Sequence, residues 1–356
     1  MIKLTQDSDF NLQCPLPSQA DTIRLAHGGG GRLMQSLIQD VFLKAFSNPY
    51  LSQLHDSAVV PIEGHRIAIT TDSYVVRPLF FPGGDIGSMA VHGTINDLAM
   101  SGATPLYLTA GFILEEGLPI ETLQRVVTSM ANAARQAGVS IVCGDTKVVD
   151  RGKGDQIFIN TTGVGQVQED IDIGHHRIQP GDRILVSGDL GSHGIAAMSV
   201  REGLSFAGGI VSDSAPLHQV VAELILEGVS IHCMRDLTRG GLASALNELG
   251  KSSKQNFLID ESQIPIQEPV RGACEVLGLD PLYVANEGKF VLFVPTNESD
   301  KALSILRKHP VSSLAGDIGE VLFSQPLHSP PVTLKTVVGT HRILDLLSGE
   351  QLPRIC

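Results

Sequence analysis

Apolar residues recur at two different spacings along this chain, and the spacing predicts where helices and strands lie. The strongest helical pattern runs over 119–137, where Leu123, Val127 and Met130 fall on one face and Pro119 suits the first turn. Short apolar runs bounded by polar residues are typical of strands. In the first half of the chain we therefore expect helices over 32–46, 87–101 and 119–137, and strands over 66–71, 105–114, 139–143 and 156–167.

A polar stretch over 168–180, which leads into Pro180-Gly181-Asp182, predicts a domain boundary. Helices and strands alternate again beyond it. Because the alternation lacks the regular ~30-residue βαβ spacing of a doubly wound parallel sheet, it favours an α+β fold of mixed sheets covered by helices. The second half predicts strands over 183–186, 289–294, 318–323 and 332–337 and near Ile231, and helices over 192–203, 214–227, 240–250, 268–277 and 299–308.

These patterns divide the chain into four parts. Residues 1–24 are polar and broken by two prolines, so we expect a mobile arm. An N-terminal domain over 25–170 and a C-terminal domain over 171–340 follow. The last part, 341–356, predicts a short helix and then an extended tail that ends on Cys356.

Composition narrows the class of function. The 356 residues carry 26 Lys+Arg against 38 Asp+Glu, a net charge of -12, which disfavours a general nucleic-acid surface because phosphates require clustered cations. No apolar stretch approaches the ~18 residues of a membrane helix, and the first residues lack a signal-peptide pattern, so we expect a cytoplasmic protein. The five cysteines form no CxxC pair, which disfavours disulfides and thiolate zinc. We expect Cys143, Cys233 and Cys274 in the core and Cys14 in the arm.

A run of four glycines, Gly28, Gly29, Gly30 and Gly31, precedes the first predicted helix. Backbone without side chains can approach a ligand closely, and the start of a helix offers free N–H groups to an anion. The run matches neither a Walker loop, since Arg32 follows it, nor a GxGxxG motif. A phosphate-binding loop and a flexible hinge both remain open.

Single acidic residues lie where apolar segments end. Asp72 and Asp145 each follow a predicted strand, Asp56 precedes one, and Asp97 lies beside Asn96 in a helix of otherwise small and apolar residues. Dispersed carboxylates that converge in space hold Mg²⁺ through hard oxygen ligands. An isolated aspartate at a strand end is also a common turn former or helix cap. Asp97 is harder to explain in that way, because a charge in an apolar helix requires a partner.

Three further residues could carry chemistry. Lys147 could contact a phosphate, act as a base, or be solvated. Glu287, between two apolar strands, could be a general base or a turn residue. Cys356 is the last residue, whereas prenylation requires a cysteine four from the end. Its thiol could be incidental, or it could be a carrier on a swinging arm that, extended from His341, reaches at most ~50 Å.

Several segments together resemble the HypE hydrogenase maturation proteins. They are His27–Arg32, Thr70–Gly87, Gly93–Met100, Gly111–Gly117, Cys143–Gly152, Arg235–Ala243, Asp280–Lys289 and the terminal Pro353–Cys356. The likeness runs from about residue 23 to the last residue, and the terminal cysteine motif is its most specific part. It implies the two-domain fold of aminoimidazole ribonucleotide synthetase, with an N-terminal ATP-binding and dimerisation domain, a C-terminal synthetase-like domain and a tail carrying the reactive cysteine.

The resemblance also implies an activity, in which ATP drives dehydration of a carbamoyl group on Cys356 to a protein thiocyanate. The thiocyanate supplies the cyanide ligand of the iron in NiFe hydrogenase. The implied partners are the carbamoyltransferase HypF as donor, the HypC–HypD complex as acceptor, and a second copy of the chain. The implied roles are Lys147 and Glu287 as candidate bases, Asp72, Asp97 and Asp145 as Mg²⁺–ATP ligands, Asn96 as an assisting residue, and Gly28–Gly31 as the loop over the nucleotide.

Two alternatives remain. The first is another ATP-using enzyme of the same fold, such as selenophosphate synthetase or thiamine monophosphate kinase, which require no terminal thiol. The selenophosphate enzyme carries its reactive cysteine near the N-terminus, where Cys14 beside Pro15 has the wrong surroundings. The second is a scaffold whose terminal cysteine binds a metal or a partner, which the intact aspartates disfavour.

Overall fold

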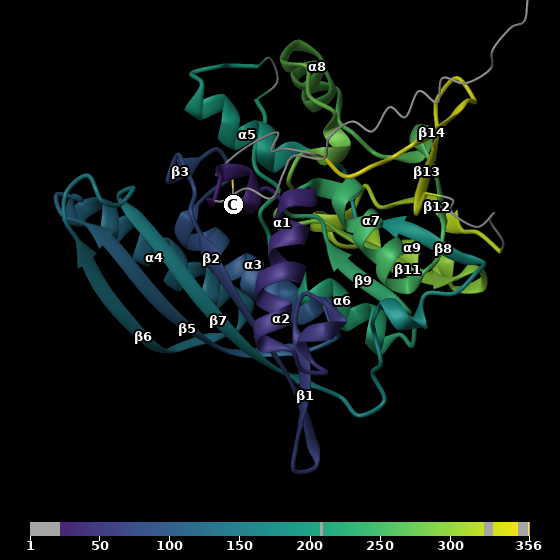
Figure 1. Ribbon diagram of the computed structural model, residues 1–356, viewed down its shortest axis with the longest axis horizontal. Helices are drawn as coiled ribbons and strands as arrows, with labels where there is room; N and C mark the ends of the chain where they lie inside the picture. Colours follow the sequence, from purple (N-terminus) through teal and green to yellow (C-terminus); the bar gives the residue numbers. More distant parts are fainter. Residues whose placement is uncertain (1–21, 207–208, 324–329, 348–354, 356) are drawn as a thin grey trace, which may run out of the picture.

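The structure is a computed structural model that describes residues 22–206, 209–323, 330–347 and 355. Most of the expected N-terminal arm, and Cys356 itself, lie outside these described residues. Two mixed sheets, one in each half of the chain, form the framework (Figure 1). The prediction of an α+β fold of mixed sheets covered by helices is confirmed.

The first sheet has the strand order β1-β2-β7-β5-β6, in which β5 and β6 run parallel and the other neighbours are antiparallel. A small hairpin, β3 (Phe80–Phe81) with β4 (Gly84–Asp85), precedes the first long helix. The strands of the sheet are β1 (Ala58–Ile62), β2 (His65–Tyr74), β5 (Thr104–Glu115), β6 (Ser140–Val149) and β7 (Ile157–Val167).

Helices α3 (Ile86–Met100) and α4 (Ile120–Ala137) cover one face of this sheet. Helix α3 begins where the Asp85 carboxylate accepts the N–H groups of Gly87 and Ser88, which satisfies two otherwise unpaired donors. Side chains of both helices pack with inward-facing residues of β5 and β7. The opposite face of the sheet is exposed, and its apolar side chains include Ile69, Tyr107 and Ile113.

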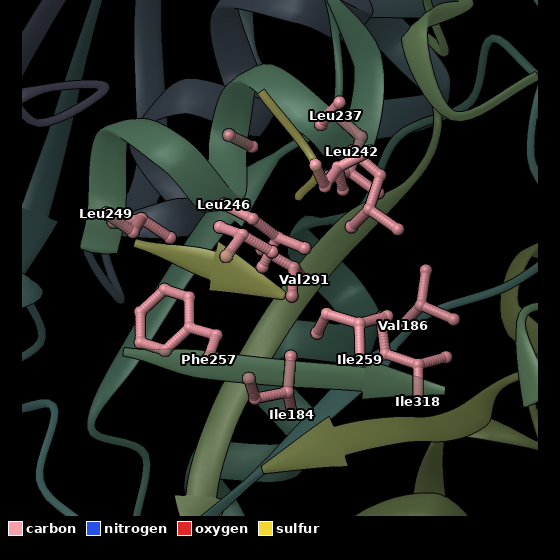
Figure 2. Close-up of a cluster of buried hydrophobic side chains, with 14 of the residues drawn as sticks. Ile184, Val186, Leu237, Leu242, Leu246, Leu249, Phe257, Ile259, Val291 and Ile318 are labelled. Atoms are coloured by element: carbon pink, nitrogen blue, oxygen red, sulfur yellow. The ribbon is translucent and has the colours of Figure 1, made fainter. Parts of the chain in front are cut away.

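The second sheet has the strand order β14-β13-β10-β12-β8-β11-β9, with β10 and β13 parallel. Its core lies under helix α7 (Gly241–Ser253), which packs Leu242, Leu246 and Leu249 over the strands (Figure 2). The strands are β8 (Asp182–Val186), β9 (Cys233–Asp236), β10 (Phe257–Asp260), β11 (Phe290–Pro295), β12 (Gly316–Val321), β13 (Val332–Lys335) and β14 (His341–Ile343).

The remaining helices complete the second half and join it to the first. Helices α6 (His218–Leu226) and α9 (Ser299–Leu306) pack on the other face of the second sheet, and α5 (Ser192–Arg201) packs with α8 (Glu268–Leu277). Helix α3 contacts α6 and β9 as well as its own sheet, so it lies at the junction of the two halves. Short 3-10 turns span Leu25–Gly28, Leu51–Gln53, His175–Arg177, Glu261–Gln263, Pro281–Tyr283, Thr296–Glu298 and Pro310–Ser312.

The helix expected over 32–46 consists of α1 (Arg32–Leu37), a π turn (Ile38–Phe42) and α2 (Leu43–Phe46). It runs between the two sheets in Figure 1. Gln35 donates a hydrogen bond to Glu248 of α7, which attaches this N-terminal helix to the second half.

Two sequence predictions are wrong. The helix expected at the start of the tail is instead the edge strand β14, which pairs with β13; its three side chains are exposed, so no strand alternation shows in the sequence. Cys143 is exposed, because β6 is the edge strand of a sheet with one open face, whereas Cys233 and Cys274 are buried as expected. Among the described helices, none is both long and apolar enough to cross a membrane.

Candidate active site

An acidic pocket lies where the two halves meet. Strand β2 supplies Asp72, helix α3 supplies Asp97, and β9 ends on Asp236. The cavity has a volume of about 50 Å³, which suits a cation with a water molecule, or one oxyanion, rather than a whole nucleotide. Its lining is Asp72, Ser73, Tyr74, Gly93, Asp97, Asp236, Thr238, Arg239 and Glu287.

A close approach between α3 and β2 sets the position of Asp72. The Tyr74 hydroxyl donates a hydrogen bond to Asp72 Oδ2 at 3.1 Å. A Cβ at Gly93 would lie 2.3 Å from that hydroxyl oxygen, so only glycine leaves room for the tyrosine here. Residue 93 is therefore glycine for a reason that connects the helix to the site.

Three carboxylates form a set that could hold a metal ion. Oxygens of Asp56, Asp97 and Asp236 all lie within 4.8 Å of one another. Asp56 Oδ2 is buried and has no hydrogen-bond partner in the described structure, while its Oδ1 lies 2.6 Å from Arg235 Nε. Thr70 Oγ1 lies 2.7 Å from Asp97 Oδ2 and fixes that side chain. A buried oxygen without a partner and an all-oxygen donor set fit Mg²⁺.

Electrostatics explain why the cluster requires a cation. Burial raises the pKa of Asp97 and of Asp236 well above the ordinary value, and the neighbouring carboxylates raise it further. Burial also raises the pKa of Asp72, and it raises that of Asp56 to about 6 against the opposing charge of Arg235. The folded chain therefore takes up protons at these groups unless a positive ion replaces them.

Glu287 is a buried acid at the edge of the same pocket. Its backbone N–H donates to Asp213 Oδ1 at 3.0 Å, and its side-chain Oε1 has no hydrogen-bond partner among the described residues. Burial raises its pKa well above the usual range, and the charges of Asp236 and Asp213 add to the effect. A raised pKa makes the ionised carboxylate a stronger base, which suits Glu287 to proton transfer with a bound substrate.

Asn96 connects α3 to the loops of the second half. Its Nδ2 donates to the carbonyl of Ala215 at 3.0 Å and to that of Glu287 at 3.3 Å. Its Oδ1 accepts the N–H of Leu217 at 2.8 Å. The side chain is 1% exposed, so its place in the structure is that of a clamp on the Glu287 loop rather than a contact with a ligand.

The glycine run borders this pocket. Arg239, which lines the cavity, donates to the carbonyl of Gly28 at 3.1 Å, and Ser244 donates to that of Gly30 at 3.0 Å. Gly30 has a φ of +73, and a Cβ there would lie 2.7 Å from the Arg239 carbonyl oxygen. Gly31 is the N-cap of α1. The run thus rests on the start of α7, beside the pocket, with Gly29 between these contacts.

Asp145 and Lys147 lie elsewhere in the single chain. Both are exposed on β6, where Lys147 Nζ lies 2.6 Å from Asp145 Oδ2 and its hydrogen bond lowers the pKa of that aspartate. Strands β7 and β5 separate β2 from β6, which places Asp145 on the order of 15 Å from Asp72. The structure therefore brings together Asp72, Asp97, Glu287 and the glycines, but not Asp145 or Lys147.

Sequence reasoning did not single out three members of the pocket, Asp236, Arg239 and Tyr74. Asp236 is the last residue of strand β9. The pattern that pointed to Asp72, an aspartate after an apolar strand segment, could therefore have pointed to Asp236 as well. Arg239 and Tyr74 carry no comparable signal, because their importance comes from long-range packing.

Comparison with known proteins agrees with this architecture. Residues 54–167 match the family described as AIR synthase related protein, N-terminal domain, and residues 179–325 match AIR synthase related protein, C-terminal domain. The chain therefore belongs to the AIR synthase related proteins.

Within that class the chain belongs to the HypE carbamoyl dehydratase family. The carbamoyl dehydratase HypE of Cupriavidus necator is 52% identical over 345 residues, which are 97% of this chain and 97% of that relative. A crystal structure of a HypE–HypF complex matches with a TM-score of 0.82 and 48% identity, over 88% of this chain and 100% of the other. A HypE crystal structure in complex with ATP matches with a TM-score of 0.79 and 50% identity, over 94% and 100%.

Proposed function

We propose that this chain is an ATP-dependent carbamoyl dehydratase that converts an S-carbamoyl group on Cys356 into S-cyanato cysteine. The carbamoyl oxygen is a poor leaving group, so it attacks the γ-phosphorus of ATP and ADP leaves. The nitrogen then loses its two protons, the C–O bond breaks, phosphate departs and a C≡N bond forms. The thiocyanate carbon becomes the cyanide ligand of hydrogenase iron.

The observation that carries this proposal is the convergence of a carboxylate set suited to a cation and a buried glutamate of raised pKa in one pocket between the two halves. Asp56, Asp97 and Asp236 would hold Mg²⁺, which when bound neutralises charge on the phosphates of ATP. Asp72 lies beside them in the same pocket. Glu287 is positioned at the pocket edge to take a proton from nitrogen. Gly28–Gly31 would lie over the nucleotide.

Lys147 and Asp145 enter the site from a second copy in this proposal. The exposed face of the first sheet carries apolar side chains, and burying such a face against an identical one is a common basis of two-fold dimers. Strand β6, which carries both residues, is exposed along nearly its whole length. In a homodimer formed through this face, Lys147 of one copy would lie near the acidic pocket of the other copy. There it would assist proton removal or contact phosphate.

The proposal also assigns partners. One solved relative is a HypE–HypF complex, and a carbamoyltransferase of that kind would load Cys356. The HypC–HypD complex, implied by the resemblance, would accept the cyanide. Another ATP-using enzyme of the same fold is disfavoured, because near full-length identity of 52% is to a carbamoyl dehydratase.

The test is the intact mass of the full chain after incubation with HypF, carbamoyl phosphate and ATP. We expect a carbamoyl adduct on Cys356 that loses one water only when ATP is supplied for the second step. Cys356→Ala abolishes the adduct, whereas Cys143→Ala, which changes an exposed thiol on β6, leaves it intact. An adduct that persists in the Cys356→Ala chain, or water loss without ATP, contradicts the proposal.

A further inference from the structure

A fully buried histidine lies between the two halves of the chain and the end of the tail. His193, near the start of α5, is 0% exposed, and its ring packs edge-on against Phe81 of β3 with the centroids 5.2 Å apart. Its Nδ1 lies 2.8 Å from Ser212 Oγ, and its Nε2 lies 3.0 Å from the carbonyl oxygen of Ile355. One side chain thus contacts the first half, a loop of the second half and the tail.

The hydrogen-bond partners fix the tautomer of His193. A carbonyl can only accept, so Nε2 carries the hydrogen and donates it to Ile355. The Ser212 hydroxyl accepts the N–H of Ser214 and donates its own hydrogen to Nδ1. Burial lowers the pKa of His193 to about 4, so the ring is neutral at physiological pH and this pattern is stable.

Ile355 is itself held on both sides. Its side chain is 2% exposed and packs with Ala197 of α5 and with Ala285, which lies two residues before Glu287. In the sequence, Ile355 directly precedes Cys356. A hydrogen bond on the carbonyl of Ile355 therefore acts on the chain one residue from the thiol.

The loop that orients His193 also holds the proposed base. Ser212 accepts a hydrogen bond from its own loop and donates to the histidine, and the next residue, Asp213, accepts the backbone N–H of Glu287. The N–H of Ser212 donates to the carbonyl of Pro82, next to β3. The segment of Ser212 and Asp213 therefore positions both His193, which contacts Ile355 of the tail, and Glu287.

We infer that His193 is a positioning residue that docks the C-terminal tail, with its Nε2–H on the Ile355 carbonyl holding Cys356 at the site that contains Glu287. The inference rests on the proposed role of Cys356 as the carrier of the reacting group. His193 does not touch the reacting atoms. It acts through Ile355, and Ser212 keeps it in the tautomer that can donate.

The test is the rate at which iodoacetamide alkylates Cys356 in the native, full-length protein, followed by mass spectrometry of the C-terminal peptide. His193→Ala removes the anchor, so we expect alkylation of Cys356 about tenfold faster, as suits the loss of one buried hydrogen bond. Cys143, exposed on β6, is an internal control whose rate stays constant. His193→Gln places an amide N–H near the position of Nε2 and keeps the rate within about twofold of wild type.

Ser212→Ala gives a second test that leaves the histidine in place. It removes the hydroxyl that orients the ring and accelerates alkylation of Cys356 without affecting Cys143. Unchanged alkylation in His193→Ala overturns the inference, as does a His193→Gln chain that reacts as fast as His193→Ala. If His193→Ala loosens the whole fold, the buried Cys233 also becomes reactive, and the comparison of Ser212→Ala with His193→Gln then decides.

Turnover separates this inference from the proposed function. With ATP varied from below to above its KM, His193→Ala lowers kcat for dehydration while the KM for ATP stays constant, because the variant changes tail position and not the nucleotide pocket. A wild-type chain that never dehydrates its carbamoyl group, but still shows His193-dependent protection of Cys356, contradicts the proposed function and leaves the anchor standing.

Discussion

A charged residue in an otherwise apolar helix is the clearest single-residue signal in this chain, and the structure gives its cause. Asp97 faces Asp56 and Asp236 across less than 4.8 Å between their oxygens. Three buried carboxylates at such distances repel one another, so protons or a cation must compensate. Burying the Asp97 carboxylate costs free energy. The compensation comes from protons or a cation in the pocket, not from an ion pair within the helix.

Asp236→Asn should weaken Mg²⁺ binding and ATP turnover together. The change keeps the shape of the side chain but removes one charged ligand, and we expect turnover to fall about 100-fold, with a higher Mg²⁺ concentration for half-maximal rate. Steady-state phosphate release against Mg²⁺ concentration measures both effects. Asp172→Asn, an exposed aspartate paired with His176, is the control that leaves both unchanged. An Asp236→Asn chain with an unaltered Mg²⁺ dependence would remove this residue from the metal set.

The raised carboxyl pKa values also predict how stability depends on pH. Unfolded aspartates lose their protons near pH 4, whereas burial raises the pKa of Asp97, Asp236 and Glu287 well above that in the folded chain. The folded state therefore binds more protons above about pH 4, and stability from these groups decreases as pH rises from there towards their raised folded-state pKa values. Mg²⁺ replaces those protons, so it should raise Tm more at about pH 8.5 than at about pH 7.

Differential scanning fluorimetry of the ATP-free protein, with and without Mg²⁺, measures this effect. Asp236→Asn reduces the pH dependence of the Mg²⁺ effect, because one titrating group is gone. Equal stabilisation by Mg²⁺ at both pH values in the wild-type chain contradicts the assignment.

At the scale of elements, helix α3 organises the site. It begins at a capped N-terminus beside the β3–β4 hairpin, approaches β2 at Gly93, clamps the Glu287 loop through Asn96 and delivers Asp97 to the carboxylates. The helix has little amphipathic character because it is buried on nearly all sides. Its position, more than any loop, aligns the two halves.

Gly93→Ala tests the close approach of α3 to β2. The new Cβ would lie 2.3 Å from the Tyr74 hydroxyl, so the tyrosine must move and release Asp72. We expect a loss of about 1–3 kcal/mol in the free energy of unfolding, measured by urea denaturation, and a loss of turnover. Gly272→Ala in α8 has open space around its Cβ and no positive φ, so it serves as a neutral control.

A second variant makes the cause specific. Tyr74→Phe removes the oxygen with which the alanine collides, so the double variant should lose less stability than the sum of the two single changes. Strict additivity of the two changes would show that the Gly93 contact is not what destabilises the helix.

Sequence patterns predicted most elements, because each depends on local periodicity. The helices over 87–101 and 119–137 match α3 and α4 within a residue or two, whereas the strand expected over 139–143 continues to Val149 as β6. Strands β1, β3, β4, β10 and β14 were not predicted, since short segments with little alternation carry no local signal. The partnership of Asp97 with Asp236 was equally hidden, because 139 residues separate them and only tertiary packing brings them together.

At the scale of the whole molecule, the first sheet is covered on one face and exposed on the other. The exposed face carries Ile69, Tyr107 and Ile113, and Asp145 and Lys147 lie on its edge strand. A single chain therefore leaves an apolar surface in water and keeps two of the expected site residues outside the acidic pocket. Both features have one explanation if a second copy covers this face.

Ile113→Arg should dissociate such a dimer, because it places a charge on the exposed face of the first sheet, beside Lys147. Light scattering after size-exclusion chromatography should give the mass of two chains for the wild type and of one chain for the variant. Leu226→Arg, on the far more exposed end of α6, is the control that stays dimeric. A wild-type chain that runs as a monomer at all accessible concentrations contradicts the homodimer.

Mixing two inactive variants tests whether the active site is shared between copies. Lys147→Ala and Glu287→Gln should each lower turnover by about 100-fold or more, as expected for loss of an acid–base group. If Lys147 of one copy serves the pocket of the other, a heterodimer of the two variants contains one complete site and one that lacks both groups. Random exchange of subunits should then restore roughly a quarter of wild-type turnover, since half of the dimers are mixed and each has one working site.

The same mixture distinguishes sharing from action within one chain. If Lys147 acts on its own pocket, every site in the mixture lacks one group, and turnover stays at the level of the single variants. Introducing Ile113→Arg into both chains should abolish the recovery, because the recovery depends on the dimer. Recovery that persists in these Ile113→Arg chains would mean that the copies meet through another surface, and the exposed face of the first sheet would then need a different partner.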